Sequence, residues 1–306
     1  MHNFKYEKRN KCKNFYEGWY LKIVDENNHT FIFIFGVSLY FKDPHAFIQI
    51  IDSSENKSYY FRFDKSNFYY NNEAIRIKDN ILGINKLKLK VEPFDIDLNI
   101  KPTILLNGGL FKKSIMSIFK NLPLPTQHEI IFMNAKVEGK IKNKDNSYVI
   151  NGNGYMEKNY GTKFPNKWLW VQTNNFKNFN TSLVLAKADL LCNFSGFFCV
   201  LNVDGDEFRY ATYTGHKMTH KTVGDDIKIT IEKGDENLLI NIKYVKGALL
   251  VAPTCKAKME KEIEESFNST LTLSLYKGNE LIYHDEATNV GCENLYLISD
   301  ECKKAS

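Results

Sequence analysis

The sequence predicts an all-β protein made of two antiparallel barrels. Short runs rich in β-branched and aromatic residues recur along the 306 residues, with clusters of Asn, Asp, Ser and Gly between them. The alternation is clearest in residues 87–91, Leu-Lys-Leu-Lys-Val, which is the period-two pattern of a strand with one buried face. The runs form two sets of about eight, which suits hairpin-connected barrels. We therefore expect one barrel in residues 1–145 and a second in residues 146–306.

The first half contains most of one expected barrel and a single helix. Its expected strands are residues 19–24, 31–39, 46–51, 59–63, 75–77, 87–91 and 94–100. In residues 108–121 apolar side chains recur at helical spacing instead: Leu110, Phe111, Ile115, Ile118 and Phe119. Pro123 and Pro125 follow and would end a helix. We expect a short helix there, ahead of the strands that close the barrel.

The second half repeats the strand rhythm. Its expected strands are residues 137–141, 148–150, 168–173, 182–188, 197–203, 207–214, 217–220, 226–231, 238–245, 271–276 and 280–283. Residues 259–267 mix Glu and Lys with apolar residues, and the pattern leaves a loop or a short helix open.

Composition excludes several classes of protein. Hydrophobic residues at 43% and charged residues at 25% are typical of a globular chain, and the net charge of +5 comes without an arginine cluster, so nucleic-acid binding is not expected. The polar N-terminus has no signal-peptide core, and no apolar run is long enough for a membrane helix. The six cysteines lack C-x-x-C spacing, which predicts free thiols and no zinc. We expect a cytoplasmic protein with loose attraction to membrane surfaces, where apolar substrates reside.

Known catalytic motifs are missing. The chain contains no G-x-S-x-G, P-loop, dinucleotide fingerprint or H-E-x-x-H sequence. Hydrolase, kinase, dehydrogenase and metalloprotease chemistry are therefore set aside.

Residues 152–176 are the most informative stretch of the chain. Glu157 and Lys158 lie there among the aromatic residues Tyr155, Tyr160, Phe164, Trp168 and Trp170. A carboxyl group among aromatic faces can have a raised pKa, and the same faces can stabilise a carbocation. The alternative is an ordinary ion pair between Glu157 and Lys158. Trp168 and Trp170 share one side of a strand, either as a stacked core pair or as a wall of a ligand lumen.

The same stretch resembles the tocopherol cyclase family. Residues 155–176, Y-M-E-K-N-Y-G-T-K-F-P-x-x-W-L-W-V-Q-T-N-x-F, are similar to that family's central signature. Residues 15–22, F-Y-E-G-W-Y-L-K, are similar to its opening motif, and residues 125–139, which contain His128, to a middle one. Ala252-Pro253-Thr254 and Gly291-Cys292-Glu293 match shorter elements near the end. The resemblance implies two lipocalin-like barrels, related in architecture to carotenoid 1,2-hydratase-type enzymes, each able to enclose an apolar ligand.

The resemblance also implies roles for particular residues. Glu157 or His128 would be the acid or proton relay, and Asn159 would orient the substrate. Substrate-binding residues would be Trp19, Tyr155, Tyr160, Trp168, Trp170 and Gln172. For Trp19 the favoured alternative is core packing, and Glu17 could face either solvent or lumen. His45 is a weaker candidate.

Three positions depart from the family pattern. Asn159 stands where an Asp is usual, Glu129 where a Gly is usual, and Ala135 where a second His is usual. An amide cannot deliver a proton as a carboxylic acid does, so the substrate and the acid step can differ from those of the family.

The resemblance implies that the activity is a cyclisation that needs no metal or cofactor. The acid protonates an alkene of a prenylated apolar substrate, such as a prenyl hydroquinone, and the phenol oxygen closes a chroman ring. Water could capture the same cation, which would make the protein a hydratase. Two other hypotheses remain open: a lipocalin-like protein that binds an isoprenoid or lipid without reacting it, and a structural module.

Overall fold

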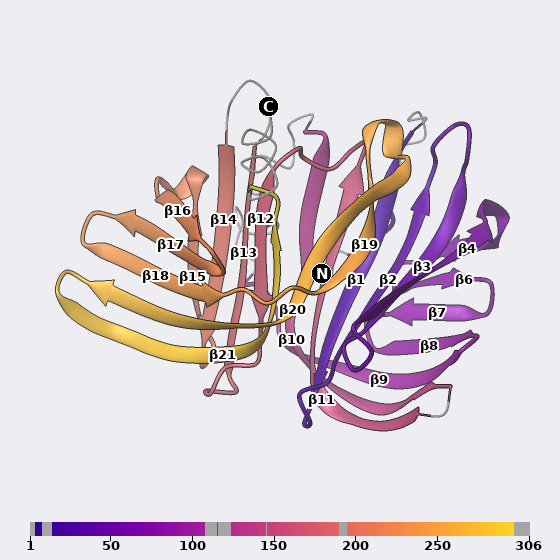
Figure 1. Cartoon of the computed structure of the whole chain (residues 1–306), viewed down its shortest axis with the longest axis horizontal. Coiled ribbons are helices and arrows are strands. Elements are labelled where there is room, and N and C mark those ends of the chain that lie inside the picture. The colour runs from indigo at the N-terminus through magenta and orange to yellow at the C-terminus, as the bar shows by residue number, and fades with distance from the viewer. Residues whose placement is uncertain are drawn as a thin grey trace. The chain divides into compact units, whose positions relative to one another are not determined.

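The computed structural model describes residues 4–7, 14–107, 115, 124–144, 146–189 and 195–296. Within these residues the chain is almost entirely β-strand, with three short 3₁₀ turns, so the predicted all-β class is confirmed (Figure 1). The helix expected over residues 108–121 lies outside the described residues, apart from Ile115, which is a buried residue in a turn. No helix in the described part of the chain is long and apolar enough to cross a membrane.

The chain forms two compact units whose borders differ from the expected ones. Unit 1 comprises Met1–Phe164 and Leu249–Ile263, and unit 2 comprises Pro165–Ala248 and Glu264–Ser306. The boundary expected at residue 145 falls in the turn of a hairpin whose two strands, β10 (Thr126–Asn143) and β11 (Asn146–Gly161), belong to one sheet. Because both strands are paired along most of their length, the chain cannot be divided there.

Unit 1 is a curled antiparallel sheet with the strand order β4-β3-β2-β1-β11-β10-β9-β8-β7-β6-β5. Its remaining strands are β1 (Tyr16–Asp25), β2 (Thr30–Ser38), β3 (His45–Asp52), β4 (Lys57–Asp64), β5 (Phe68–Tyr70), β6 (Ala74–Ile77), β7 (Asn80–Gly83), β8 (Lys86–Val91) and β9 (Phe94–Ile104). The edge strands β4 and β5 are separated in the chain only by the 3₁₀ turn η1 (Lys65–Asn67). The sheet must therefore curl until its two edges approach, and it encloses the hydrophobic core of unit 1, which we call barrel 1.

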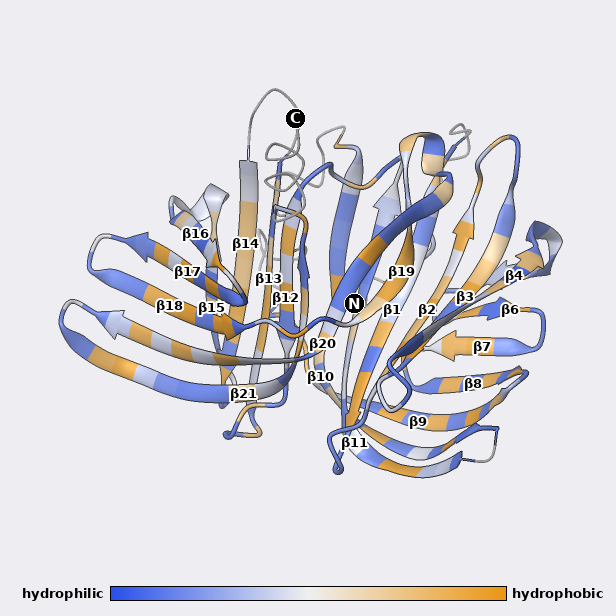
Figure 2. Ribbon diagram, viewed as in Figure 1, coloured by the Kyte–Doolittle hydropathy of each residue, from blue (hydrophilic) through white to orange (hydrophobic). Residues whose placement is uncertain are grey.

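Side-chain alternation fixes which face of each strand enters barrel 1. Along β8, Leu87 and Leu89 are buried while Lys88 is exposed, and Figure 2 shows the same alternation along β8 and β9. In contrast, β1 and β3 are buried on both faces almost throughout. The second face of these strands is therefore covered as well.

Part of that cover in unit 1 comes from a late segment of the chain, β19 (Ala248–Pro253) and the residues after it. The side-chain amide of Gln49 donates to Val251 O at 2.9 Å and accepts from Val251 N at 2.8 Å. Ser38 Oγ donates to Ala257 O at 2.7 Å. These bonds satisfy buried polar groups on both sides, so the segment is fixed to the sheet by specific contacts.

Unit 2 has the strand order β15-β14-β13-β12-β21-β20-β18-β17-β16, and β19 pairs with β20. Its strands are β12 (Trp168–Thr173), β13 (Thr181–Asp189), β14 (Ser195–Val203), β15 (Asp206–Ala211), β16 (Lys217–Val223), β17 (Asp226–Lys233), β18 (Glu236–Lys243), β20 (Met259–Lys277) and β21 (Glu280–Asn294). Its core includes Leu169, Val171 and Leu273. A loop or helix at residues 259–267 is wrong, because these residues begin the long strand β20.

Candidate functional site

Strand β11 carries the predicted acid and divides its surroundings in two. Successive side chains of a strand point to opposite faces. The side chains directed into barrel 1 are Met156, Lys158 and Tyr160, whereas those on the outer face are Tyr155, Glu157 and Asn159. The aromatic cluster that the sequence suggested around Glu157 is therefore split between two sites.

The Glu157 site, on the outer face, consists of Tyr155, Glu157, Asn159 and His128. Glu157 accepts a hydrogen bond from Tyr155 Oη at 2.6 Å and one from Asn159 Nδ2 at 2.9 Å. His128 is opposite Asn159 on the neighbouring strand β10, and its Nε2 lies 3.1 Å from Glu157 Oε2. That separation is an ion-pair distance, although the ring nitrogen is not aligned as for a well-directed hydrogen bond.

Hydrogen bonds and burial fix the position of the Glu157 side chain. Two hydrogen-bond donors stabilise the charged form of Glu157 against the cost of its burial. Burial and the neighbouring Glu157 carboxylate raise the pKa of Tyr155 well above its usual value, so its phenol remains a donor. The side chain of His128 is 12% exposed and that of Glu157 only 5%, so a substrate reaches the imidazole more easily than the carboxylate. The imidazole is thus the more accessible member of the pair and the carboxylate the more enclosed one.

Asn159 gains a role from its contact with Glu157. Its amide donates to the carboxylate, which an ionised Asp could not do. An Asp at this position would place a second carboxylate beside the first. The Asn at position 159, where the family usually has Asp, therefore suits the hydrogen bond that Glu157 accepts there.

Two further residues of β1 share this face. Tyr20 lies directly opposite Glu157 and Lys22 opposite Tyr155, at the usual cross-strand spacing of about 5 Å between Cβ atoms. Both side chains are buried, and Lys22 is only 1% exposed. We did not single out these residues from the sequence. The alternation of β1, with Trp19 directed inward, was the signal that could have identified them.

Inside barrel 1 lies a second group of charged residues, the Lys158 cluster, formed by Lys158, Glu17, Glu129 and Glu7. Lys158 Nζ lies 3.2 Å from Glu17 Oε1, 3.7 Å from Glu129 Oε2 and 3.8 Å from Glu7 Oε1. Burial raises the pKa of Glu17 to about 8, although the Lys158 ammonium opposes the shift. The separation of Lys158 Nζ and Glu17 Oε1 is an ion-pair distance between two buried side chains. An ion pair between Glu157 and Lys158 is wrong, because adjacent residues of β11 face opposite sides.

Trp19 and Tyr160 also lie in the interior of barrel 1. Trp19 is fully buried and its Nε1 donates to Phe4 O at 3.3 Å. Tyr160 Oη donates to Glu129 Oε1 at 3.4 Å. Core packing of Trp19 is confirmed. Both rings lie on the face of the sheet opposite Glu157, so they do not line a site at that carboxylate, and their role in substrate binding stays a prediction.

Trp168, Trp170 and Gln172 belong to β12 of unit 2. Leu169 and Val171 point into the core of that unit, so the two indoles and Gln172 occupy the opposite face. Trp168 Nε1 donates a hydrogen bond to the carboxylate of Glu293. Both indoles thus lie on the face of β12 opposite the core of unit 2, and their role in substrate binding stays a prediction.

His45 has a structural setting. Its Nδ1 lies 2.9 Å from Asp43 O and its Nε2 2.8 Å from Tyr60 Oη. Burial lowers the pKa of its ring, which favours the neutral form. Both nitrogens are thus occupied at one end of β3.

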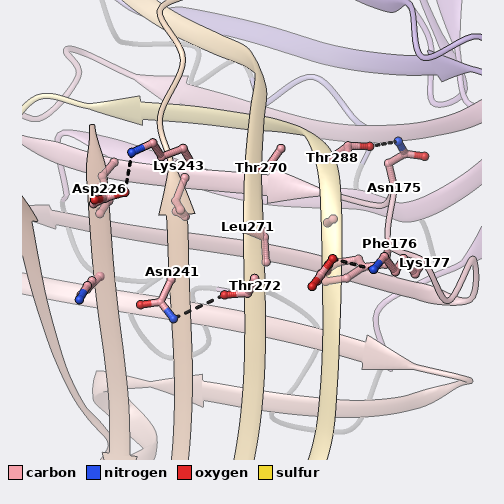
Figure 3. A pocket seen from close by; sticks show the side chains of 15 residues that line it. Asn175, Phe176, Lys177, Asp226, Asn241, Lys243, Thr270, Leu271, Thr272 and Thr288 are labelled. Atoms are coloured by element: carbon pink, nitrogen blue, oxygen red, sulfur yellow. Dashed lines mark hydrogen bonds and ion pairs between the residues drawn. The ribbon is translucent and has the colours of Figure 1, made fainter. Parts of the chain in front are cut away.

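A hollow of about 780 Å³ lies in unit 2, and none of the site residues predicted by sequence lines it. Figure 3 shows polar side chains from β17, β18, β20 and β21 around it. Many are paired with each other: Lys177 with Glu286 at 2.6 Å, Lys243 with Asp226 at 3.2 Å and Asn175 with Thr288 at 2.7 Å. No acid–base pair comparable to Glu157 and His128 lines it. Among the described residues, no group of three His, Cys, Asp or Glu side chains is arranged to hold a metal ion.

Comparison with known proteins agrees with this architecture. The family model described as "Tocopherol cyclase-like" matches residues 90–293. No curated protein sequence matches the chain. Among solved structures, the fold is similar to an AttH-type protein from Nitrosomonas europaea, with 12% identity, 93% of each chain covered and a TM-score of 0.57. It is also similar to kievitone hydratase from Nectria haematococca, with 11% identity, 91% of this chain and 88% of that chain covered, and a TM-score of 0.51. CghA crystallised with Sch210972 is similar as well, with 7% identity, 92% of this chain and 88% of that chain covered, and a TM-score of 0.56.

Proposed function

Because the chain belongs to the tocopherol cyclase-like family, we propose that it is an enzyme that cyclises a prenylated, largely apolar substrate by acid catalysis. The observation that carries this proposal is the contact between His128 Nε2 and Glu157 Oε2, with Glu157 held by Tyr155 and Asn159. This arrangement pairs a proton carrier with a buried group that orients it.

The proposed reaction begins with a protonated His128. The imidazolium gives its proton to a trisubstituted alkene of the prenyl chain, so a C–H bond forms as the π bond breaks. The tertiary carbocation is attacked by the phenol oxygen of the same substrate, and a C–O bond closes the ring. The phenol proton returns to His128, so the product is an isomer of the substrate and the pair is restored.

Each residue of the Glu157 site has a distinct task in this scheme. Glu157 stabilises the imidazolium and orients the ring toward the substrate. Tyr155 and Asn159 hold Glu157 and keep it charged. Burial of the site keeps water away from the cation, which would otherwise trap it. If water is admitted instead, the same cation yields a hydrated product, the type of reaction that the name of kievitone hydratase describes for that protein.

The test is a product assay with geranylgeranyl- and phytyl-substituted hydroquinones. We expect the wild-type protein to form the chromanol, which has the mass of the substrate. Glu157→Gln and His128→Gln should each reduce turnover by about 10²–10⁴-fold, the usual contribution of a positioned acid.

Matched controls are available on exposed positions. Glu138→Gln lies on β10 and His284→Gln on β21, and both side chains are exposed, so both variants should retain wild-type activity. A product heavier by one water would identify a hydratase. Tight binding of unchanged substrate would indicate a carrier and contradict catalysis. Full activity in both Glu157→Gln and His128→Gln would contradict the proposed site.

A further inference from the structure

Residues 4–7 fill the interior of barrel 1 beside the Lys158 cluster. Phe4 is fully buried and Tyr6 is 6% exposed, and both belong to the core of this barrel. Their rings lie 5.9 Å and 6.3 Å from that of Trp19, and Tyr6 also lies 4.6 Å from Tyr70. The two aromatic side chains of this short segment thus supply part of the packing inside the barrel.

Backbone atoms of residues 4–7 form hydrogen bonds with side chains of the barrel. Lys158 Nζ donates to Lys5 O at 2.5 Å, and Trp19 Nε1 donates to Phe4 O at 3.3 Å. Glu7 N donates to Glu17 Oε2 at 2.8 Å. In the described part of the chain, residues 4–7 join no strand of the sheet. The segment is therefore fixed to the barrel by side chains of the barrel and by its own rings, and not by a strand ladder.

This combination of groups resembles a bound ligand. An aromatic ring lies against an indole, and a carbonyl oxygen accepts from an ammonium group. We propose that the interior of barrel 1 is a ligand site, closed in this structure by residues 4–7, and that its ligand is an aromatic molecule bearing a carboxylate or carbonyl group. Antiparallel barrels commonly enclose one small apolar ligand in this position.

The Lys158 cluster loses a hydrogen-bond acceptor when the segment leaves. Departure of residues 4–7 removes the Lys5 carbonyl from Lys158 and withdraws the Glu7 carboxylate. Glu17 and Glu129 stay beside Lys158, but the ammonium group loses the oxygen to which it donates, and a buried donor without its acceptor is costly. The carboxylate or carbonyl oxygen of a ligand would supply that acceptor.

This site is separate from the Glu157 site. Lys158 and Glu157 are adjacent in sequence but lie on opposite faces of β11. Variants of residues 4–7 therefore test barrel 1 without altering the proton-transfer pair.

The experiment uses Trp19 as the reporter. In a Trp168→Phe/Trp170→Phe background, Trp19 is the remaining tryptophan of the chain. Residues 1–7 are deleted, and anthracene-2-carboxylate, a fluorescent aromatic carboxylate, is titrated in. We expect one probe molecule per chain, energy transfer from Trp19, and binding at least about tenfold tighter than to the undeleted chain. A synthetic peptide of residues 1–8 should displace the probe, and Lys158→Met in the deleted chain should weaken binding of the probe.

Two outcomes would overturn the proposal. One is a folded deletion variant that binds the probe no better than the undeleted chain. The other is measured on the intact protein, and it tests the proposal even if the deletion variant does not fold. We expect the Glu7 amide to exchange with deuterium faster than the ladder amides of β1, and acrylamide to quench Trp19 without unfolding. Protection of Glu7 equal to that of β1, with Trp19 unquenched, would show that residues 4–7 are a permanent part of the core.

Discussion

Replacing Glu17 by Gln should remove much of the pH dependence of the stability of unit 1. Burial raises the pKa of Glu17 from the model-peptide value of 4.5 to about 8. The folded protein therefore binds a proton at Glu17 more tightly than the unfolded chain does. The stability that this proton contributes is complete below pH 4.5 and is lost as the pH rises through 8.

The size of the effect follows from the shift. Each pKa unit corresponds to about 1.4 kcal/mol, so the full titration of Glu17 is worth on the order of 5 kcal/mol. The difference between the wild-type and Glu17→Gln profiles isolates Glu17. Gln keeps an oxygen that can accept from Glu7 N, so that contact can be retained.

The assay is urea unfolding at a series of pH values, followed by the fluorescence of Trp19 in the Trp168→Phe/Trp170→Phe background. The free energy of unfolding of the wild type should fall, relative to that of Glu17→Gln, as the pH rises from about 4.5 to 8. Glu138→Gln, an exposed position of the same barrel, should follow the wild type. Parallel profiles for wild type and Glu17→Gln would refute the reasoning, because Glu17 would then titrate alike in the folded and unfolded states.

Two further predictions concern packing and buried amides. Gly291→Ala should lower the stability of unit 2 by about 1–3 kcal/mol, since its Cβ would lie 2.9 Å from a ring carbon of Trp170. Gly18→Ala is the control for thermal unfolding, because its Cβ would meet Ile34 at an ordinary 3.7 Å; equal losses for the two variants would contradict the steric explanation. Gln49→Leu should cost about 1–3 kcal/mol for each backbone group of Val251 that loses its partner, and hydrogen exchange at the Val251 amide should accelerate. Unchanged exchange there would mean that water or another group replaces the glutamine.

Much of the fold was predictable from local patterns. The expected strands 19–24 and 87–91 lie within β1 and β8, because alternation and β-branched residues reflect burial of one face. The first part of β10 was not predicted as a strand. Gln127 and Glu129 point into the barrel although they are polar, so the sequence there lacks the alternation of apolar and polar residues that marks a strand. The domain boundary expected at residue 145 was wrong because a turn in the sequence indicates a hairpin, but it does not indicate whether the two strands of that hairpin also pair with strands far away in the chain.

The candidate site was predicted only in part. Sequence proximity and resemblance pointed to Glu157, His128, Asn159 and Tyr155, which the structure brings together. The same proximity wrongly grouped Tyr160 with them, although its odd spacing from Glu157 already placed it on the other face of a strand. The contacts of Lys158 with Glu17 and Glu129 could not be predicted, because they depend on pairing between strands far apart in the chain.

The segment 249–263 belongs to unit 1 but follows most of unit 2 in the chain. During synthesis on the ribosome, residues 1–164 therefore emerge long before the segment that binds Gln49 and Ser38. Until then one face of the nascent barrel is uncovered, and such faces attract chaperones or other chains. A gene fragment cut at residue 164 would keep that vulnerability permanently, so the first barrel is best expressed with the rest of the polypeptide.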